Sequence, residues 1–199
     1  MSTPCSCPPL PLDPQHADPA AVRVRLLRPG EESRIDEVVA GLSPGSRFLR
    51  FHTGTPRLTF AVRRQLASVV PGQQVSALAL HDDVGVGLAG WVRDPVDPSM
   101  AELAVAVADD WQGLGIGARL VSALGDAAAE AGITVFACHV HAENRGLRRR
   151  LRRAGAHSTA DPTELLLPLK ALPGAGPVVV PWPRGVRSPR AVAGRPRRS

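Results

Sequence analysis

Strand-like stretches recur along the middle of the chain. In residues 21–27, Val22, Val24 and Leu26 alternate with arginines, which is the pattern of a half-buried strand. Five more apolar stretches, separated by turn residues, are predicted strands at 75–80, 84–92, 101–107, 133–140 and 163–169. The first three of these five are separated only by His81-Asp82-Asp83 and by a segment with two prolines and two aspartates, so we expect them to form an antiparallel meander.

Apolar residues at helical spacing predict the helices between these strands. The predicted helices lie at 31–42, from Ser43-Pro44 onward, at 56–70, from a glycine-rich loop to Gly132, and at 143–154. The resulting order, β-α-α-β-β-β-α-β-α-β, predicts an α/β (α+β) fold whose sheet mixes antiparallel hairpins with one parallel crossover. There is no internal repeat.

The two ends of the chain show neither the alternation of a strand nor the apolar spacing of a helix. Residues 1–20 are rich in proline, and residues 171–199 combine proline with arginine, so neither segment can bury enough apolar surface to hold an ordered structure. The sequence therefore predicts a proline-rich flexible leader over 1–20, one folded domain over 21–170 and a flexible tail over 171–199.

The charge is concentrated in that tail. The whole chain has a net charge of +6, and the tail carries six arginines and no acid, so residues 1–170 are formally neutral. A tail of this kind can bind nucleic acid weakly, but a neutral domain gives no reason to expect a nucleic-acid partner. The oligomeric state is not predicted by any pattern in the sequence.

The apolar runs and the cysteines of the sequence predict where the protein is located and whether it forms disulfides. No apolar run is long enough for a membrane span, and the N-terminus has prolines in place of a signal peptide's apolar stretch, so we expect a soluble, cytoplasmic protein without a membrane partner. The three cysteines do not make a disulfide framework. Cys5, Cys7 and His16 do not have the spacing of a structural zinc site, and we expect no metal.

The chemistry-bearing motif is a glycine loop, Gln112-Gly113-Leu114-Gly115-Ile116-Gly117, between a predicted strand and a helix. Glycines there let backbone amides approach an anion, and a helix N-terminus adds positive potential, which suits a pyrophosphate. A tight turn without a ligand is the alternative. Ala118 and Arg119 replace the Lys-Ser/Thr of a triphosphate-binding loop. A dinucleotide site fits Gly113, Gly115 and Ala118, but it requires an acid at the end of the next strand, which instead ends in histidine.

These residues resemble the GNAT superfamily of N-acetyltransferases, and most closely its domains related to bacterial protein-lysine acetyltransferases. Gln112, Gly115 and Gly117 match its acyl-CoA motif, and Asn144 matches its CoA-contacting asparagine, so the similarity covers about residues 21–169. The resemblance implies a GNAT-type sheet with helices on both faces, acetyl-CoA as co-substrate and a primary amine of a protein or small molecule as acceptor. It implies acetyl-CoA contacts from Val105, Ala106, Val107, Gln112, Gly113, Leu114, Gly115, Ile116, Gly117, Ala118 and Asn144.

A base must remove a proton from the amine, and Glu102 is the candidate because it interrupts an apolar strand on the face of Ala104 and Ala106. A structural ion pair with Arg93 is the alternative role. Many family members carry a tyrosine seven residues after the motif asparagine to protonate the leaving thiolate, and Leu151 occupies that position here. The leaving thiol could instead be assisted by Cys138, His139 or His141, or need no acid at all.

Two further segments have open interpretations. In the predicted helix after Ser43, we expect Phe48 and Phe51 to pack into the core while the arginines face water. The arginines between Arg145 and Arg153 are interpreted as a solvated face. A more specific hypothesis places Arg145 or Arg148 near the CoA phosphates. The missing tyrosine keeps a second function open, a CoA-binding sensor without catalysis.

Overall fold

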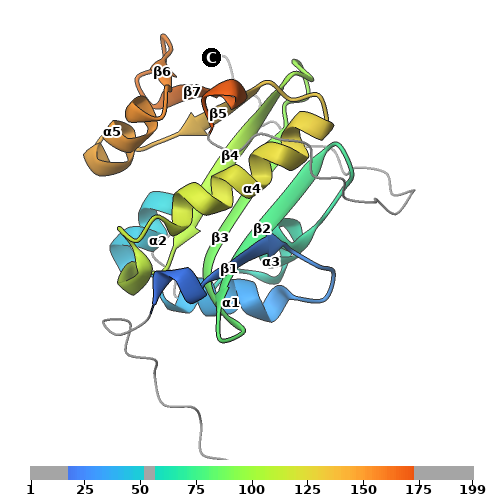
Figure 1. Cartoon of the computed structure of the whole chain (residues 1–199), viewed down its shortest axis with the longest axis vertical. Coiled ribbons are helices and arrows are strands. Elements are labelled where there is room, and N and C mark those ends of the chain that lie inside the picture. Colours follow the sequence, from blue (N-terminus) through green and yellow to red (C-terminus); the bar gives the residue numbers. More distant parts are fainter. Residues whose placement is uncertain (1–17, 52–56, 173–199) are drawn as a thin grey trace, which may run out of the picture.

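The computed structural model describes residues 18–51 and 57–172. In this part of the chain seven strands form one sheet, in the order β1-β2-β3-β4-β5-β7-β6 (Figure 1). All neighbours pair antiparallel except β4 and β5, which confirms the predicted sheet with one parallel crossover. The strands are β1 Arg23–Leu26, β2 Gln74–His81, β3 Val84–Arg93, β4 Met100–Val107, β5 Val135–His139, β6 His157–Ser158 and β7 Glu164–Pro168.

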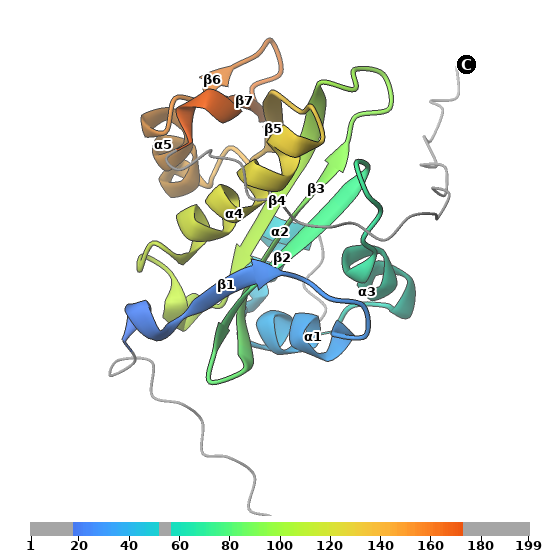
Figure 2. The same cartoon turned by 45° about the vertical axis from the view of Figure 1, so that its right-hand side comes forward.

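Helices cover both faces of the sheet. Helix α4 crosses one face of the sheet, and α1 and α3 lie on the other face, which can be seen in the turned view of Figure 2. The α-helices are α1 Glu32–Ala40, α2 Pro44–Phe51, α3 Phe60–Ala67, α4 Ile116–Glu130 and α5 Arg145–Arg153. The predicted order was wrong in one respect, because it counted two helices before β2 and the structure has three. The helix expected from Ser43-Pro44 onward is present as α2. The two-residue strand β6 was not predicted, since it is too short to show a period.

Two clusters of buried side chains hold these layers together. Trp91, Phe136, Leu120 and Leu124 are among the residues buried between the sheet and α4. A second cluster, which includes Ile35 of α1, fills the space on the opposite face. Strand β2 is buried along almost its whole length because it is covered from both sides.

The first described residues lie directly ahead of β1. Asp18 caps a single 3-10 turn, Pro19–Ala21, by accepting a hydrogen bond from the backbone N–H of Ala20, just ahead of β1. The predicted leader residues Cys5, Cys7 and His16, and the arginine tail beyond Leu172, lie outside the described residues. Among the helices that are described, none is both long and apolar enough to cross a membrane.

Candidate functional site

The parallel strands β4 and β5 are paired over only part of their length. The register joins Met100 to Val135, Ala101 to Phe136 and Glu102 to Ala137, and it ends there. Strand β4 continues to Val107 on its other neighbour, β3. The edge of β4 that faces β5 therefore has backbone groups without strand partners from Leu103 onward. Such groups need a partner, and a ligand lying in the gap between the two strands can supply it.

The glycine loop lies at the end of β4. Gly113 and Gly115 have φ angles of +81° and +80°, in the left-handed region that favours glycine. Gly115 is the N-cap of α4, and neither a side-chain cap nor an acidic residue serves the first turn of this helix. The first backbone N–H groups of α4 are thus free of side-chain partners within the described residues, and together with the helix dipole they favour an anion. The pyrophosphate site at this position stays a prediction.

Two polar side chains connect this loop to β4 and to the start of α2. Gln112 donates from its amide to the carbonyl of Val107 and to the Asp109 carboxylate, both at 3.0 Å. Asp109 also accepts a hydrogen bond from the backbone N–H of Ser43, at the start of α2. Burial alone raises the pKa of Asp109, but hydrogen bonds from Ser43 and Ser46 and the charge of Arg47 bring it below its ordinary value. An ionised Asp109 therefore links the loop to α2.

The side chains of β4 divide between the two faces of the sheet. A Cβ built on Gly117 in α4 would lie 3.8 Å from Val105 and 3.9 Å from Val107, so the odd-numbered residues face α4. Glu102 therefore lies on the opposite face with Ala104 and Ala106, as predicted. Its side chain is exposed, at the point where β4 and β5 separate.

Arg93 is not the partner of Glu102. It donates to three backbone carbonyls, those of Gly72, Pro98 and Ala131. In the register of β3 and β4, Arg93 lies opposite Ala101, whereas Glu102 lies opposite Val92. The structural ion pair considered as an alternative role for Glu102 is therefore absent among the described residues.

Helix α2 lies against β4 with its side chains in an unexpected arrangement. The expectation for Phe48 was wrong, because 49% of this residue is exposed. Phe51 is partly buried, as expected. Arg50 does not face water as predicted: it is half-buried, its Nε is buried without a hydrogen-bond partner, and its guanidinium carbon lies 4.8 Å from the centre of the Phe51 ring.

The other residues considered for acid or base roles differ in position. Cys138 is buried on the α4 side, and burial raises the pKa of its thiol to about 12, so it is an inert core residue. His139 is exposed and shares the face of Glu102, two residues after Ala137. His141 follows β5 and packs edge-on to Phe48, with 6.3 Å between ring centres. The described residues contain no group of His, Cys, Asp and Glu that could hold a metal ion.

The predicted second motif forms the start of α5. Asn144 caps this helix, and its side-chain oxygen accepts a hydrogen bond from the backbone N–H of Leu147 at 3.2 Å. Leu147, Leu151 and Ala154 pack against the core, which confirms the predicted apolar seam. Leu151 thus has a packing role at the position where many members of the resembled family carry a tyrosine.

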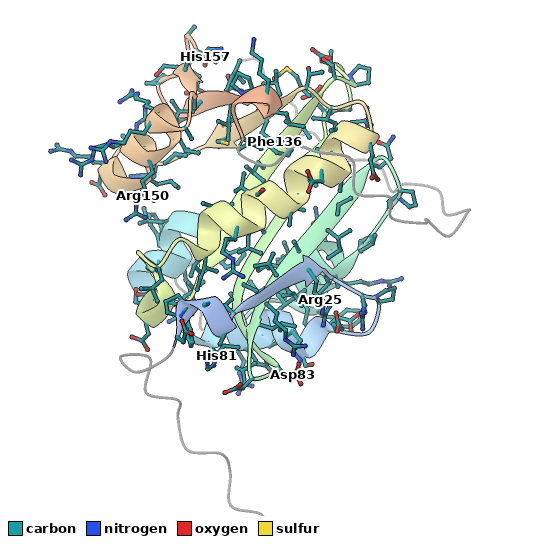
Figure 3. All side chains as sticks on the ribbon, in the orientation of Figure 1. Arg25, His81, Asp83, Phe136, Arg150 and His157 are labelled. Carbon is teal, nitrogen blue, oxygen red and sulfur yellow. The ribbon has the colours of Figure 1, made fainter. Side chains whose placement is uncertain are left out.

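The arginines of α5 lie around the outside of this seam. Arg148 donates to the carbonyl of Val140, and Arg152 to the hydroxyl of Ser158. Arg149, Arg150 and Arg153 are exposed, and none of the α5 arginines forms an ion pair with a described residue. Figure 3 shows Arg150 on α5 at the periphery of the domain. The predicted solvated face agrees with this exposure.

Comparisons with known proteins add independent findings. The family model described as Acetyltransferase (GNAT) family matches residues 48–156. The acetyltransferase PA5475 of Pseudomonas aeruginosa is 30% identical over 146 residues, covering 72% of this chain and 78% of that protein. The acetyltransferase Pat of Mycolicibacterium smegmatis is 40% identical over 68 residues, which are 34% of this chain and 20% of Pat.

A solved structure supports the fold. The GNAT domain of S. lividans PAT superposes with a TM-score of 0.66 at 22% sequence identity. The superposition covers 74% of this chain and 89% of that domain. At this level of identity the similarity concerns the fold alone, and it agrees with the mixed sheet and the helices on both of its faces.

Proposed function

The chain belongs to the GNAT family of acetyltransferases, and from that premise we propose that it transfers an acetyl group from acetyl-CoA to a primary amine. The observation that supports this proposal most directly is the separation of β4 from β5 after Glu102 and Ala137. The resulting gap leads from an exposed carboxylate to the uncapped N-terminus of α4. A long thioester with a pyrophosphate at one end fits a site of that shape and polarity.

The proposed binding site for acetyl-CoA follows the gap. The backbone of Val105, Ala106 and Val107 would hold the pantetheine arm, and Asn144, which caps the start of α5, would contact acetyl-CoA as well. The loop and the first turn of α4 would hold the pyrophosphate through backbone N–H groups. The loop and turn residues in question are Gln112, Gly113, Leu114, Gly115, Ile116, Gly117 and Ala118.

Glu102 is the proposed general base. An amine is protonated at neutral pH and must lose a proton to become nucleophilic, so Glu102 would accept that proton directly or through water. The neutral nitrogen then attacks the thioester carbonyl, the new C–N bond forms, the C–S bond breaks, and the nitrogen loses its second proton to solvent. The thiolate takes a proton from solvent, because a thiol with a pKa of about 8.5 leaves without strong acid help.

A second candidate function rests on Leu151. This residue packs against the core where an acid would be needed if the thiolate could not leave unassisted. A protein that binds acetyl-CoA without turning it over would then be a sensor or binding module. Cofactor binding in the absence of turnover with any amine would favour this candidate.

The test separates the two functions in two steps. Thermal unfolding is first measured with and without acetyl-CoA, and we expect stabilisation that increases with ligand concentration. CoA release is then followed with a thiol reagent across polyamines, aminoglycosides, lysine peptides and protein N-termini. No thermal shift would contradict both functions, whereas a shift without CoA release would contradict catalysis alone.

A further inference from the structure

Helix α2 places a cation on the same side of the sheet as the proposed base. Glu102 faces away from α4, and α2 contacts β4 and packs Phe51 against the buried cluster on the side opposite α4. Glu102 and Arg50 therefore lie on the same side of the sheet. The two side chains do not form an ion pair within the described residues. Each therefore keeps its capacity to bind an opposite charge.

Arg50 is an unusual residue for a helix surface. Its neighbour in sequence Leu49 and the nearby Phe48 are more exposed than it is, although both are apolar. Burial lowers the pKa of the Arg50 guanidinium, and the negative charge of Glu102 opposes that change. An arginine does not lose its proton in a protein, so this half-buried side chain remains a cation.

A half-buried cation without a carboxylate partner costs free energy unless another group compensates it. The Phe51 ring at 4.8 Å supplies part of that compensation. The ring cannot accept the hydrogen bonds of the guanidinium, however, and the Nε of Arg50 is buried without a partner. An incoming anionic group could accept hydrogen bonds from this fork of donors.

Resting on the function proposed above, we propose that the acceptor is an amino acid-type zwitterion, with its ammonium group at Glu102 and its carboxylate at Arg50. The two protein charges are opposite in sign and do not pair with each other, so together they complement a molecule that carries both signs. Glu102 would attract the ammonium group before it removes a proton, and Arg50 would fix the other end. The exposed Phe48, which packs on His141, would line the space beside them.

The proposal distinguishes this substrate class from simple amines. An alkylamine can satisfy Glu102 but leaves Arg50 without its anion, so it should bind more weakly than the amino acid of the same length. Because the distance between the two charges determines which zwitterion fits, one chain length should be preferred in a series of ω-amino acids. Arg50 would act on binding of the acceptor and hence mainly on KM.

The experiment uses the full chain and matched pairs of acceptors. Acetyl transfer is measured with glycine, β-alanine, γ-aminobutyrate and ε-aminocaproate, and with the methyl ester or the alkylamine of each. We expect one amino acid to exceed its counterpart without a carboxylate about ten- to hundredfold in kcat/KM. In Arg50→Gln that preference should disappear through a higher KM, while the alkylamine is turned over within about twofold of the original rate. Arg50→Lys should restore part of the preference, since it keeps the charge but not the fork.

A control variant and a binding measurement make the result unambiguous. Arg64→Gln removes the same charge from an exposed position on α3 and should leave the preference unchanged. Calorimetric binding of the preferred amino acid in the presence of CoA tests Arg50 without requiring turnover. Equal loss with amino acids and alkylamines in Arg50→Gln would overturn the proposal, as would a wild-type protein that binds none of the amino acids. Failure of acetyl-CoA to bind would instead contradict the proposed function.

Discussion

Glu102 and Ala137 are the last residues that pair β4 with β5, and each strand continues beyond them on its other neighbour. Strand β4 stays with β3 as far as the pair of Val107 and Gly87, and β5 stays with β7 as far as His139 and Glu164. The gap between the strands is therefore held open by ladders on both of its sides. A ligand in the gap would meet backbone groups that are already in position, which lowers the ordering cost of binding.

The glycine loop offers a pair of substitutions that separate backbone strain from ligand approach. Gly115→Ala forces a side chain onto a φ of +80°, and we expect a loss of about 1–2 kcal/mol in unfolding free energy together with weaker acetyl-CoA binding. Gly117 lies in the first turn of α4, where an added Cβ would make only ordinary contacts. Gly117→Ala should therefore keep or raise the stability of the free protein and still weaken acetyl-CoA binding. Urea unfolding and titration calorimetry measure the two quantities.

The Gly117→Ala variant tests the approach of the pyrophosphate to the backbone more directly than Gly115→Ala does. If Gly117→Ala binds acetyl-CoA as tightly as the original protein, the pyrophosphate does not approach the backbone at this position. Gly146→Ala is a control for helix propensity, since Gly146 is an exposed position of α5 with nothing near an added Cβ. It should stabilise the protein by about 0.5–1 kcal/mol without changing acetyl-CoA binding.

The ion pair between Arg25 and Glu31 predicts a pH dependence of stability. Arg25 donates to both Glu31 oxygens, at 2.6 and 2.8 Å, and this contact lowers the pKa of Glu31 from 4.5 to about 2. Figure 3 shows Arg25 on β1. Since the folded pKa lies below the unfolded one, the contribution is complete above about pH 4.5 and is lost as the pH falls toward 2. Glu31→Gln should cost about 2 kcal/mol at pH 7 and almost nothing near pH 2.

Urea unfolding at several pH values measures this difference. Asp83→Asn is the matched control, because Asp83 pairs with Arg23 at 2.5 Å while both side chains are about 70% exposed. That exposed pair should contribute less than about 0.5 kcal/mol at any pH. A Glu31→Gln deficit that persists unchanged at pH 2 would show that the carboxylate charge is not its cause.

The absence of tyrosine predicts the form of the pH–rate profile. The chain contains no tyrosine, and Leu151 occupies the position at which many family members place one. If the thiolate leaves without an acid, kcat/KM should rise with pH and then stay level, with no decline near pH 10. Initial rates of CoA release between pH 6 and 10, checked for protein stability at each value, test this. A decline with a midpoint near 10 would identify an acid that this mechanism lacks.

The sequence predicted most of the sheet because each strand has a recognisable local pattern of apolar residues bounded by turn residues. The meander of β2, β3 and β4 consists of apolar stretches with turn chemistry between them, and Asp82 and Asp83 indeed have the positive φ angles of a tight turn. The glycine loop was recognisable for a similar local reason. Gly115 is needed for its backbone conformation, which depends little on distant parts of the chain.

Helix α2 could not be predicted in the same way. Its sequence places Phe48, Leu49, Arg50 and Phe51 side by side, and periodicity alone assigns the aromatic residues to the core. In the structure no residue of α2 is fully buried, although this helix contacts β4. The position of Arg50 on the same side of the sheet as Glu102 depends on contacts between segments that are far apart in the sequence. An arginine flanked by apolar residues in a predicted helix was the only signal available.

Glu102 provides the most direct test of the proposed chemistry. Glu102→Gln keeps the size of the side chain but removes its capacity to accept a proton, so kcat/KM should fall about 10²- to 10⁴-fold at pH 7. Because Glu102 is exposed and has no ion pair among the described residues, thermal stability and the stabilisation by acetyl-CoA should stay unchanged. Glu130→Gln removes the same charge from the exposed end of α4 and should have the original activity. Unchanged turnover in Glu102→Gln would assign the proton transfer to another group, for which the exposed His139 on the same face is a candidate.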